Sequence, residues 1–176
     1  MDARAERIKL FTAVRNILYA TDGAHDAQTL MAFGRGDCLA KSAYLVQGFH
    51  RLGYQARRVR WLYRLPDQPP EVRLLPSRDD IHSAVEVLIE GQWTLVDATH
   101  DPALAAAGLV VAEWDGITDT PPAYRPRGPV WRPGDGPEPT LGVCWEDALD
   151  AEAGDRYQRA FNQWLRDVRT GASPPI

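Results

Sequence analysis

The sequence predicts an α+β fold, with helices towards both ends of the chain and an antiparallel β-sheet between them. Four stretches show the apolar spacing of about 3.6 residues that is typical of amphipathic helices. Between the third and the fourth stretch, shorter segments alternate apolar and polar residues as strands do, and two of them flank a tight turn. Because the 176 residues show neither an internal repeat nor a clear boundary, we expect a single domain over residues 1–176.

The four predicted helices follow from these apolar patterns and from residues at their ends. In chain order they cover about residues 3–20, 26–33, 38–52 and 155–169. The third begins at Cys38, with Asp37 at the position of an N-cap and Gly53 just beyond its last turn. The fourth carries an apolar stripe made of Tyr157, Phe161, Trp164, Leu165 and Val168.

The predicted strands lie in the middle of the chain. Residues 55–64 alternate in the manner of a strand, and residues 82–89 and 92–97 flank the dipeptide Glu90-Gly91, which is typical of a hairpin turn. A two-residue loop pairs position 89 with position 92. Because side chains alternate between the two faces of a strand, His82 and Asp97 then lie on one face, roughly 7–8 Å apart at the backbone.

A segment rich in proline and glycine covers residues 115–142. Such a long segment without an apolar pattern is usually functional or disordered. Three tryptophans flank it or lie within it, namely Trp114, Trp131 and Trp145. They could line a peptide groove under a lid, or they could pin a proline-rich strap to the core.

Composition excludes several classes of protein. The net charge of -4 is opposite to that of a domain that binds a nucleic-acid backbone. No segment has the length and apolarity of a signal peptide or a membrane span, so we expect neither export nor a membrane partner. The two cysteines, Cys38 and Cys144, are interpreted as reduced thiols, which favours a cytoplasmic location. We expect Cys144 to be inert packing.

No metal or cofactor is expected. The residues that could ligate a metal are Cys38, Cys144, His25, His50, His82 and His100. They lack the short paired spacing of zinc ligands, and no acidic run has the spacing of a calcium loop. No glycine-rich phosphate motif follows a predicted strand.

Cys38 is the candidate nucleophile because it opens a helix. The first backbone N–H groups of a helix have no internal partners, and the peptide dipoles leave partial positive charge there. A thiolate is favoured at such a position, and the same N–H groups could hold a developing oxyanion. The alternative is that Cys38 is a small buried residue that fills a gap in the core.

His82 and Asp97 are the candidate base and its orienting partner. An aspartate held against one ring nitrogen of His82 would fix the tautomer and stabilise the imidazolium, which leaves the other nitrogen for Cys38. Taken singly, His82 could start an edge strand and Asp97 could end one. Their occurrence together on one face of a hairpin favours the catalytic interpretation.

The middle of the chain resembles the transglutaminase-like family. The segment around the cysteine, GDCLAKSA over residues 36–43, is similar to the nucleophile motif of that family. The segments HSAVEV (82–87) and QWTLVDAT (92–99) are similar to its histidine and aspartate blocks, and the resemblance covers residues 34–100. It implies a papain-like, transglutaminase-like fold in which the nucleophile helix packs on an antiparallel β-sheet.

The resemblance also implies a function. Cys38 would be the nucleophile, His82 the acid and base, and Asp97 the orienter of a cysteine-dependent amide hydrolase or acyltransferase. The reaction would pass through a thioester, and the substrate would be a peptide or protein amide. The family often has a tryptophan two residues after the histidine, and Ala84 stands there, so the aromatic wall of the acyl pocket is left open.

Two alternatives remain open at this level. One is a catalytically inactive module that binds a peptide or protein, suggested by Ala84 and by the arginines of residues 57–64, namely Arg57, Arg58, Arg60 and Arg64. Those arginines are more simply interpreted as the solvated side of a strand. The other alternative is acyl transfer like that of arylamine N-acetyltransferases, for which the chain is short.

Overall fold

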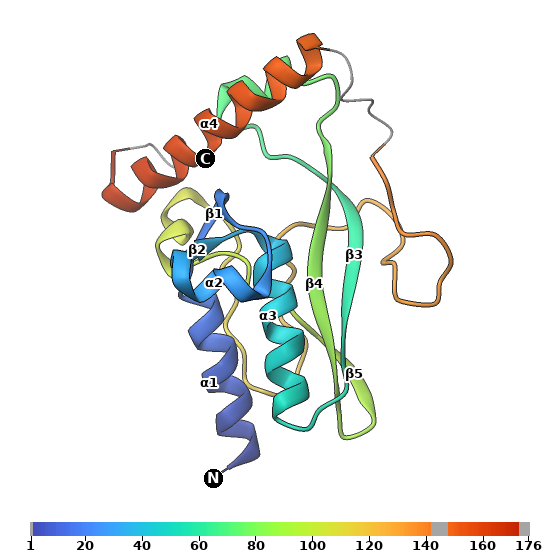
Figure 1. Cartoon of the computed structure of the whole chain (residues 1–176). Helices are drawn as coiled ribbons and strands as arrows, with labels where there is room; N and C mark the ends of the chain where they lie inside the picture. Colours follow the sequence, from blue (N-terminus) through green and yellow to red (C-terminus); the bar gives the residue numbers. More distant parts are fainter. Residues whose placement is uncertain (1, 142–147, 173–176) are drawn as a thin grey trace.

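A three-stranded antiparallel sheet lies at the centre of the fold (Figure 1). The computed structural model describes residues 2–141 and 148–172. The strands are β3 (Ala56–Arg64), β4 (Asp79–Ile89) and β5 (Gln92–Val96), in the order β3-β4-β5. The predicted α+β class and its antiparallel sheet are therefore confirmed. β4 starts three residues earlier than predicted.

The β4–β5 hairpin has the predicted register. Ile89 pairs with Gln92, and the ladder continues to the pair Val85 and Val96. The two loop residues, Glu90 and Gly91, have φ values of 50° and 83°, as a type I′ turn requires. Since β5 ends at Val96, Asp97 lies one residue beyond the ladder.

Helix α3 (Cys38–Arg51) packs against the sheet, and α1 (Ala3–Arg15) packs against α3 (Figure 1). A buried cluster joins them to β4 and β5, with Phe11, Val14, Leu45, Phe49, Val85, Val87, Ile89, Val96 and Ala98 among its members. α3 starts and stops where the sequence predicts. The Asp37 side chain accepts a hydrogen bond from the Ala40 N–H, and Gly53 follows the last turn with a φ of 85°.

The helix predicted over residues 3–20 is too long. The helix ends at Arg15. Further along, the chain forms the strand β1 (Leu18–Ala24), which pairs in parallel with the short strand β2 (Arg35–Gly36). The backbone N–H groups of Tyr19 and Thr21 donate to the side chains of Asp101 and Asn162. These distant partners offer the backbone an alternative to helical hydrogen bonds, so tertiary contacts override the local apolar pattern.

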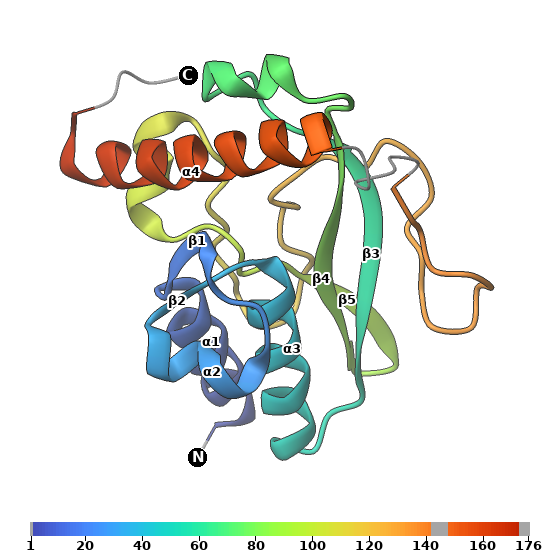
Figure 2. The same cartoon turned by 45° about the horizontal axis from the view of Figure 1, so that its top comes forward.

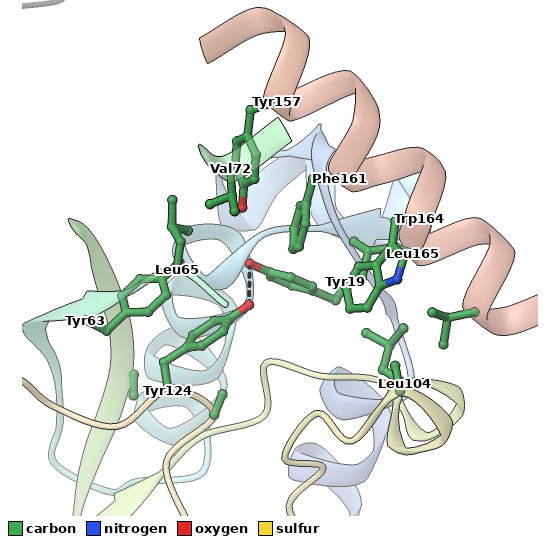
Figure 3. Packing of buried hydrophobic residues seen from close by; sticks show 14 of the residues in the cluster. Tyr19, Tyr63, Leu65, Val72, Leu104, Tyr124, Tyr157, Phe161, Trp164 and Leu165 are labelled. Atoms are coloured by element: carbon green, nitrogen blue, oxygen red, sulfur yellow. Dashed lines mark hydrogen bonds between the residues drawn. The ribbon is translucent and has the colours of Figure 1, made fainter. Parts of the chain in front are cut away.

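The helix predicted over residues 26–33 is observed as α2 (Ala27–Phe33), with Asp26 as its N-cap, and it lies between β1 and β2 in the chain. The last helix, α4 (Ala148–Thr170), begins seven residues before the predicted start. It lies across one end of the molecule, close to β1 and to the short 3₁₀ helices Pro70–Leu74 and Pro102–Ala107 (Figure 2). Its predicted apolar stripe is buried in the cluster drawn in Figure 3.

The proline-rich segment follows both edges of the sheet over the part that the structure describes, residues 115–141. On the β5 side, the Thr120 N–H donates to the carbonyl of Leu95 over 2.9 Å. On the β3 side, Trp131 and Arg60 exchange two backbone hydrogen bonds, of 3.0 and 2.7 Å. The segment is therefore bound to the sheet as a strap. Gly142, Cys144 and Trp145 lie outside the described residues.

Three of the four arginines of β3 are paired within the chain. Arg57 contacts Glu86, whereas Arg58 and Arg60 both contact Glu138 of the strap, at distances between 2.7 and 3.1 Å.

Over residues 2–141 and 148–172, no helix has both the length and the apolar character needed to cross a bilayer.

Candidate active site

Cys38 is held at the first turn of α3 by close packing before the helix. A Cβ atom on Gly36 would lie 2.6 Å from the Leu30 side chain and 2.9 Å from the Ala24 carbonyl oxygen, so only glycine fits there. The Asp37 N–H donates to the same Ala24 carbonyl. This contact fixes where the helix starts, and Cys38 is left half-buried beside a pocket of about 220 Å³.

His82 and Asp97 are in direct contact, as the hairpin register predicts. Nε2 of His82 lies 2.8 Å from Oδ2 of Asp97, and both side chains are fully buried. The carboxylate also accepts hydrogen bonds from the N–H groups of Thr99 and Ala123, at 3.1 and 2.7 Å. Asp97 is thus oriented by its own loop and by the strap.

The charges of this pair stabilise each other. Burial alone would raise the pKa of Asp97, but the charge and hydrogen bond of His82 together with the N–H donors hold it below its usual value. Burial alone would lower the pKa of His82, but the Asp97 carboxylate and then Cys38 raise it above its usual value. The imidazolium is therefore the favoured form of His82 near neutral pH.

The second nitrogen of His82 is free for Cys38. Among the described residues Nδ1 is buried without a hydrogen-bond partner of ordinary geometry. Cys38 lies close enough to raise the pKa of His82, as a hydrogen-bonding group and as a charge. The structure thus brings all three predicted residues to one place, with His82 in contact with Asp97 and close to Cys38.

Aromatic rings enclose His82. The ring centroids of Trp61, Tyr63 and Tyr124 lie 4.9, 6.0 and 5.2 Å from that of the imidazole. Ala84 is buried in the cluster that contains these rings, which come from β3 and the strap. Figure 3 shows Tyr124 facing Tyr19, with their hydroxyl groups joined, and Tyr63 stacks on the ring of Tyr124.

The sequence reasoning missed Tyr124 and Lys41. Tyr124 lies in a proline-rich segment with no apolar pattern, so no local signal marks it. Lys41 lies one turn after Cys38 and is only 1% exposed, with its ammonium donating to the carbonyls of Arg15, Ala98 and Thr99. The sequence did contain a signal for Lys41, because this lysine falls on the apolar face of the predicted helix and lysine is rarely buried unless it is paired.

The other histidines lie apart from one another. His25 contacts Asp37, His50 contacts the Ala56 carbonyl, and buried His100 contacts the Val110 carbonyl. Over the described ranges, no three His, Cys, Asp or Glu side chains are grouped so that they could hold a metal ion.

A helix that begins at a cysteine, packed on an antiparallel sheet that carries a buried histidine–aspartate pair, defines the papain-like class of folds. The sequence model described as "Transglutaminase-like superfamily" matches residues 3–98, which is more than half of the chain. The chain therefore belongs to the transglutaminase-like superfamily.

Comparison with solved structures finds a crystal structure from Cytophaga hutchinsonii that is described as a "putative cysteine protease". The two chains are 21% identical over the matched part, with a TM-score of 0.38. The match covers 55% of this chain and 30% of the other, so this chain corresponds to less than a third of that protein. A search of curated proteins finds no match.

Proposed function

We propose that this protein is a cysteine-dependent amide hydrolase or acyltransferase that acts through a thioester on Cys38. The observation that supports the proposal is the position of His82, which contacts Asp97 through Nε2 and leaves Nδ1 for Cys38. A thiol beside an imidazole that a carboxylate orients is the arrangement that activates a cysteine nucleophile.

In the first half of the reaction, the Cys38 thiolate attacks the carbonyl carbon of an amide. The carbonyl oxygen becomes an oxyanion, which the unpartnered N–H groups at the start of α3 can stabilise. When the intermediate collapses, the C–N bond breaks and the His82 imidazolium gives its proton to the leaving amine. The products are a free amine and an acyl-thioester on Cys38.

In the second half, water or a neutral amine attacks the thioester carbonyl. His82, now neutral, takes a proton from the attacking group, and the Cys38 sulfur leaves as a thiolate. The products are a carboxylic acid from water or a new amide from an amine. The thiolate–imidazolium pair is restored, and no other reactant is needed.

We propose further that the substrate is a peptide or protein amide and that the protein works in the cytoplasm, where a free thiol stays reduced. The part of the pocket that the structure describes is open to solvent beside Cys38 and has room for a side chain next to the reacting carbonyl.

Alkylation with iodoacetamide, followed by mass mapping of the labelled cysteine, tests the proposal. We expect Cys38 to react at least ~10-fold faster than Cys144 at neutral pH, because a thiolate is the reacting form. His82→Gln should remove the difference, whereas Cys144→Ser should leave the Cys38 rate unchanged. Equally slow labelling of both thiols in the wild-type protein would contradict the proposal.

A turnover assay on a panel of peptide amides completes the test. Cys38→Ala should abolish amine release while the circular dichroism spectrum stays that of the wild type. Amine release that survives this substitution would show that the nucleophile lies elsewhere.

A further inference from the structure

Asp80 places a second carboxylate beside the Cys38 pocket. It lies two residues before His82 on β4, so the two side chains leave the strand on the same face. Its partner across the sheet is Tyr63, which packs against His82. Asp80, Tyr63 and Cys38 all line the pocket of about 220 Å³.

The Asp80 carboxylate is only partly engaged by the protein. Oδ1 accepts a 2.7 Å hydrogen bond from the N–H of its neighbour Ile81, and Oδ2 has a long 3.4 Å contact with the Tyr63 hydroxyl. A carboxylate can accept about four hydrogen bonds, so capacity remains on the pocket side. Among the described residues, no lysine or arginine lies within ion-pair distance of Asp80, whereas the adjacent Asp79 is paired with Arg127.

Two cations that act on the Asp80 charge are paired with other carboxylates. His82 and Arg60 both act on the Asp80 charge. His82 is paired with Asp97, and Arg60 lies 2.9 Å from Glu138. Each of these cations is thus shared with another carboxylate, and among the described residues neither forms an ion pair with Asp80.

The rest of the described pocket lining carries little positive charge. Its uncharged members are Tyr19, Thr21, Leu39, Tyr63, Ile81 and Gln158. His25 is the one basic side chain in the described lining, and its Nδ1 lies 2.5 Å from the carboxylate of Asp37, which also lines the pocket. Burial raises the pKa of Asp80, which means that its charge is poorly solvated and would gain from a cation.

We propose that Asp80 binds a cationic group of the substrate, an ammonium or a guanidinium, carried on a side chain next to the amide that Cys38 attacks. This inference rests on the proposed function of Cys38. A volume of about 220 Å³ equals that of roughly seven waters, which suits one side chain rather than a folded segment. An ammonium has no lone pair, so the bound cation is a recognition group and not the attacking amine.

A matched series of electrophiles tests the inference. The probes are peptidyl chloromethyl ketones that differ in one side chain, which is lysine, norleucine or glutamate. Norleucine keeps the aliphatic chain of lysine and removes the charge. The measurement is the second-order rate constant for alkylation of Cys38, with the labelled residue identified by mass spectrometry.

In the wild-type protein we expect the lysine probe to react about 10-fold faster than the norleucine probe, as one charge-assisted hydrogen bond allows. The glutamate probe should be the slowest. Asp80→Asn should bring the lysine-to-norleucine ratio close to unity. Asp79→Asn is the matched control, because Asp79 is paired with Arg127, and it should keep the wild-type ratio.

The outcomes separate this inference from the proposed function. If Cys38 reacts readily with iodoacetamide but equally fast with the lysine and norleucine probes, the cation site is wrong and the nucleophile stands. A lysine preference that persists in Asp80→Asn also overturns the inference. If neither iodoacetamide nor any of the three probes labels Cys38 faster than Cys144, the proposed function is wrong and the inference is wrong with it.

Discussion

The ammonium of Lys41 lies 2.7 Å from the carbonyl oxygen of Thr99, two residues after Asp97. Lys41 is also one helical turn after Cys38 on α3. A single buried side chain therefore ties the helix that presents the thiol to the loop that carries the carboxylate. We interpret Lys41 as a positioning residue, since its ammonium points at backbone carbonyls and not at the Cys38 pocket.

Lys41→Met should destabilise the protein by about 2 kcal/mol, because it keeps the aliphatic volume but leaves buried carbonyls without a donor. Urea unfolding measures this change. The rate of Cys38 alkylation should fall as well, because the Asp97 loop loses its anchor to α3.

Lys9→Met is the matched control for this substitution, because Lys9 is exposed on α1. It should change the free energy of unfolding by less than about 0.5 kcal/mol. If the two variants behave alike, Lys41 does not hold the site together.

The raised pKa of His82 makes its contribution to stability depend on pH. Burial opposes the imidazolium, but the Asp97 carboxylate outweighs burial and moves the pKa above the ordinary value of 6.5. A group with a raised pKa in the folded state binds its proton more tightly there. Its stabilising effect is complete below the pKa of the unfolded chain and is lost as the pH rises through the pKa of the folded protein.

We therefore expect the loss of unfolding free energy in His82→Gln to be larger at about pH 6 than at about pH 10. Urea unfolding of the wild type and the variant at each pH gives the difference. A difference that stays constant over this range would mean that no imidazolium–carboxylate pair exists in the folded protein.

The strap contributes to the site through Thr120. Its hydroxyl accepts a 2.9 Å hydrogen bond from the Asp97 N–H, and both residues are buried. Thr120→Val keeps the shape of the side chain but leaves that N–H without an acceptor, which costs about 1–3 kcal/mol. We expect lower stability in urea and slower alkylation of Cys38.

Thr118→Val provides the comparison for Thr120→Val, because Thr118 contacts Asp115 and Trp114 and not Asp97. It should leave the alkylation rate close to that of the wild type. Equal effects of both valine substitutions would indicate that the strap acts only through general packing.

The parts of the site that the sequence predicts are those with local signals. The start of α3 follows from the capping position of Asp37, and the meeting of His82 with Asp97 follows from the turn at Glu90-Gly91. Both depend on contacts between residues that are close in the chain or joined by one hairpin. The spacing of the residues and the alternation of side chains along a strand are therefore enough to predict both features.

The features that escape prediction depend on residues far apart in the sequence. β1 is extended because its backbone N–H groups bind Asp101 and Asn162, more than 80 residues away. Tyr124 reaches His82 only because the strap follows both edges of the sheet. Neither the apolar period nor the turn chemistry of these segments contains that information.

The contact between Arg169 and Asp101 connects α4 to the strand that lines the site. The guanidinium lies 2.6 Å from Oδ2 of Asp101 and 2.6 Å from the carbonyl oxygen of Tyr19, and the same Oδ2 accepts the Tyr19 N–H. Asp101 is 1% exposed, so the loss of Arg169 leaves a buried carboxylate without its cation. Arg169→Met should therefore lower the free energy of unfolding by about 3 kcal/mol.

A double-mutant cycle separates this ion pair from the packing of the arginine stem. Asp101→Asn removes the charge that Arg169 balances, so the double variant should be more stable than the sum of the two single losses predicts, by about 1–3 kcal/mol. Because Tyr19 lines the Cys38 pocket, Arg169→Met should also slow Cys38 alkylation, and Asp101→Asn should partly restore the rate. Strictly additive losses would show that the Arg169–Asp101 pair does not position β1.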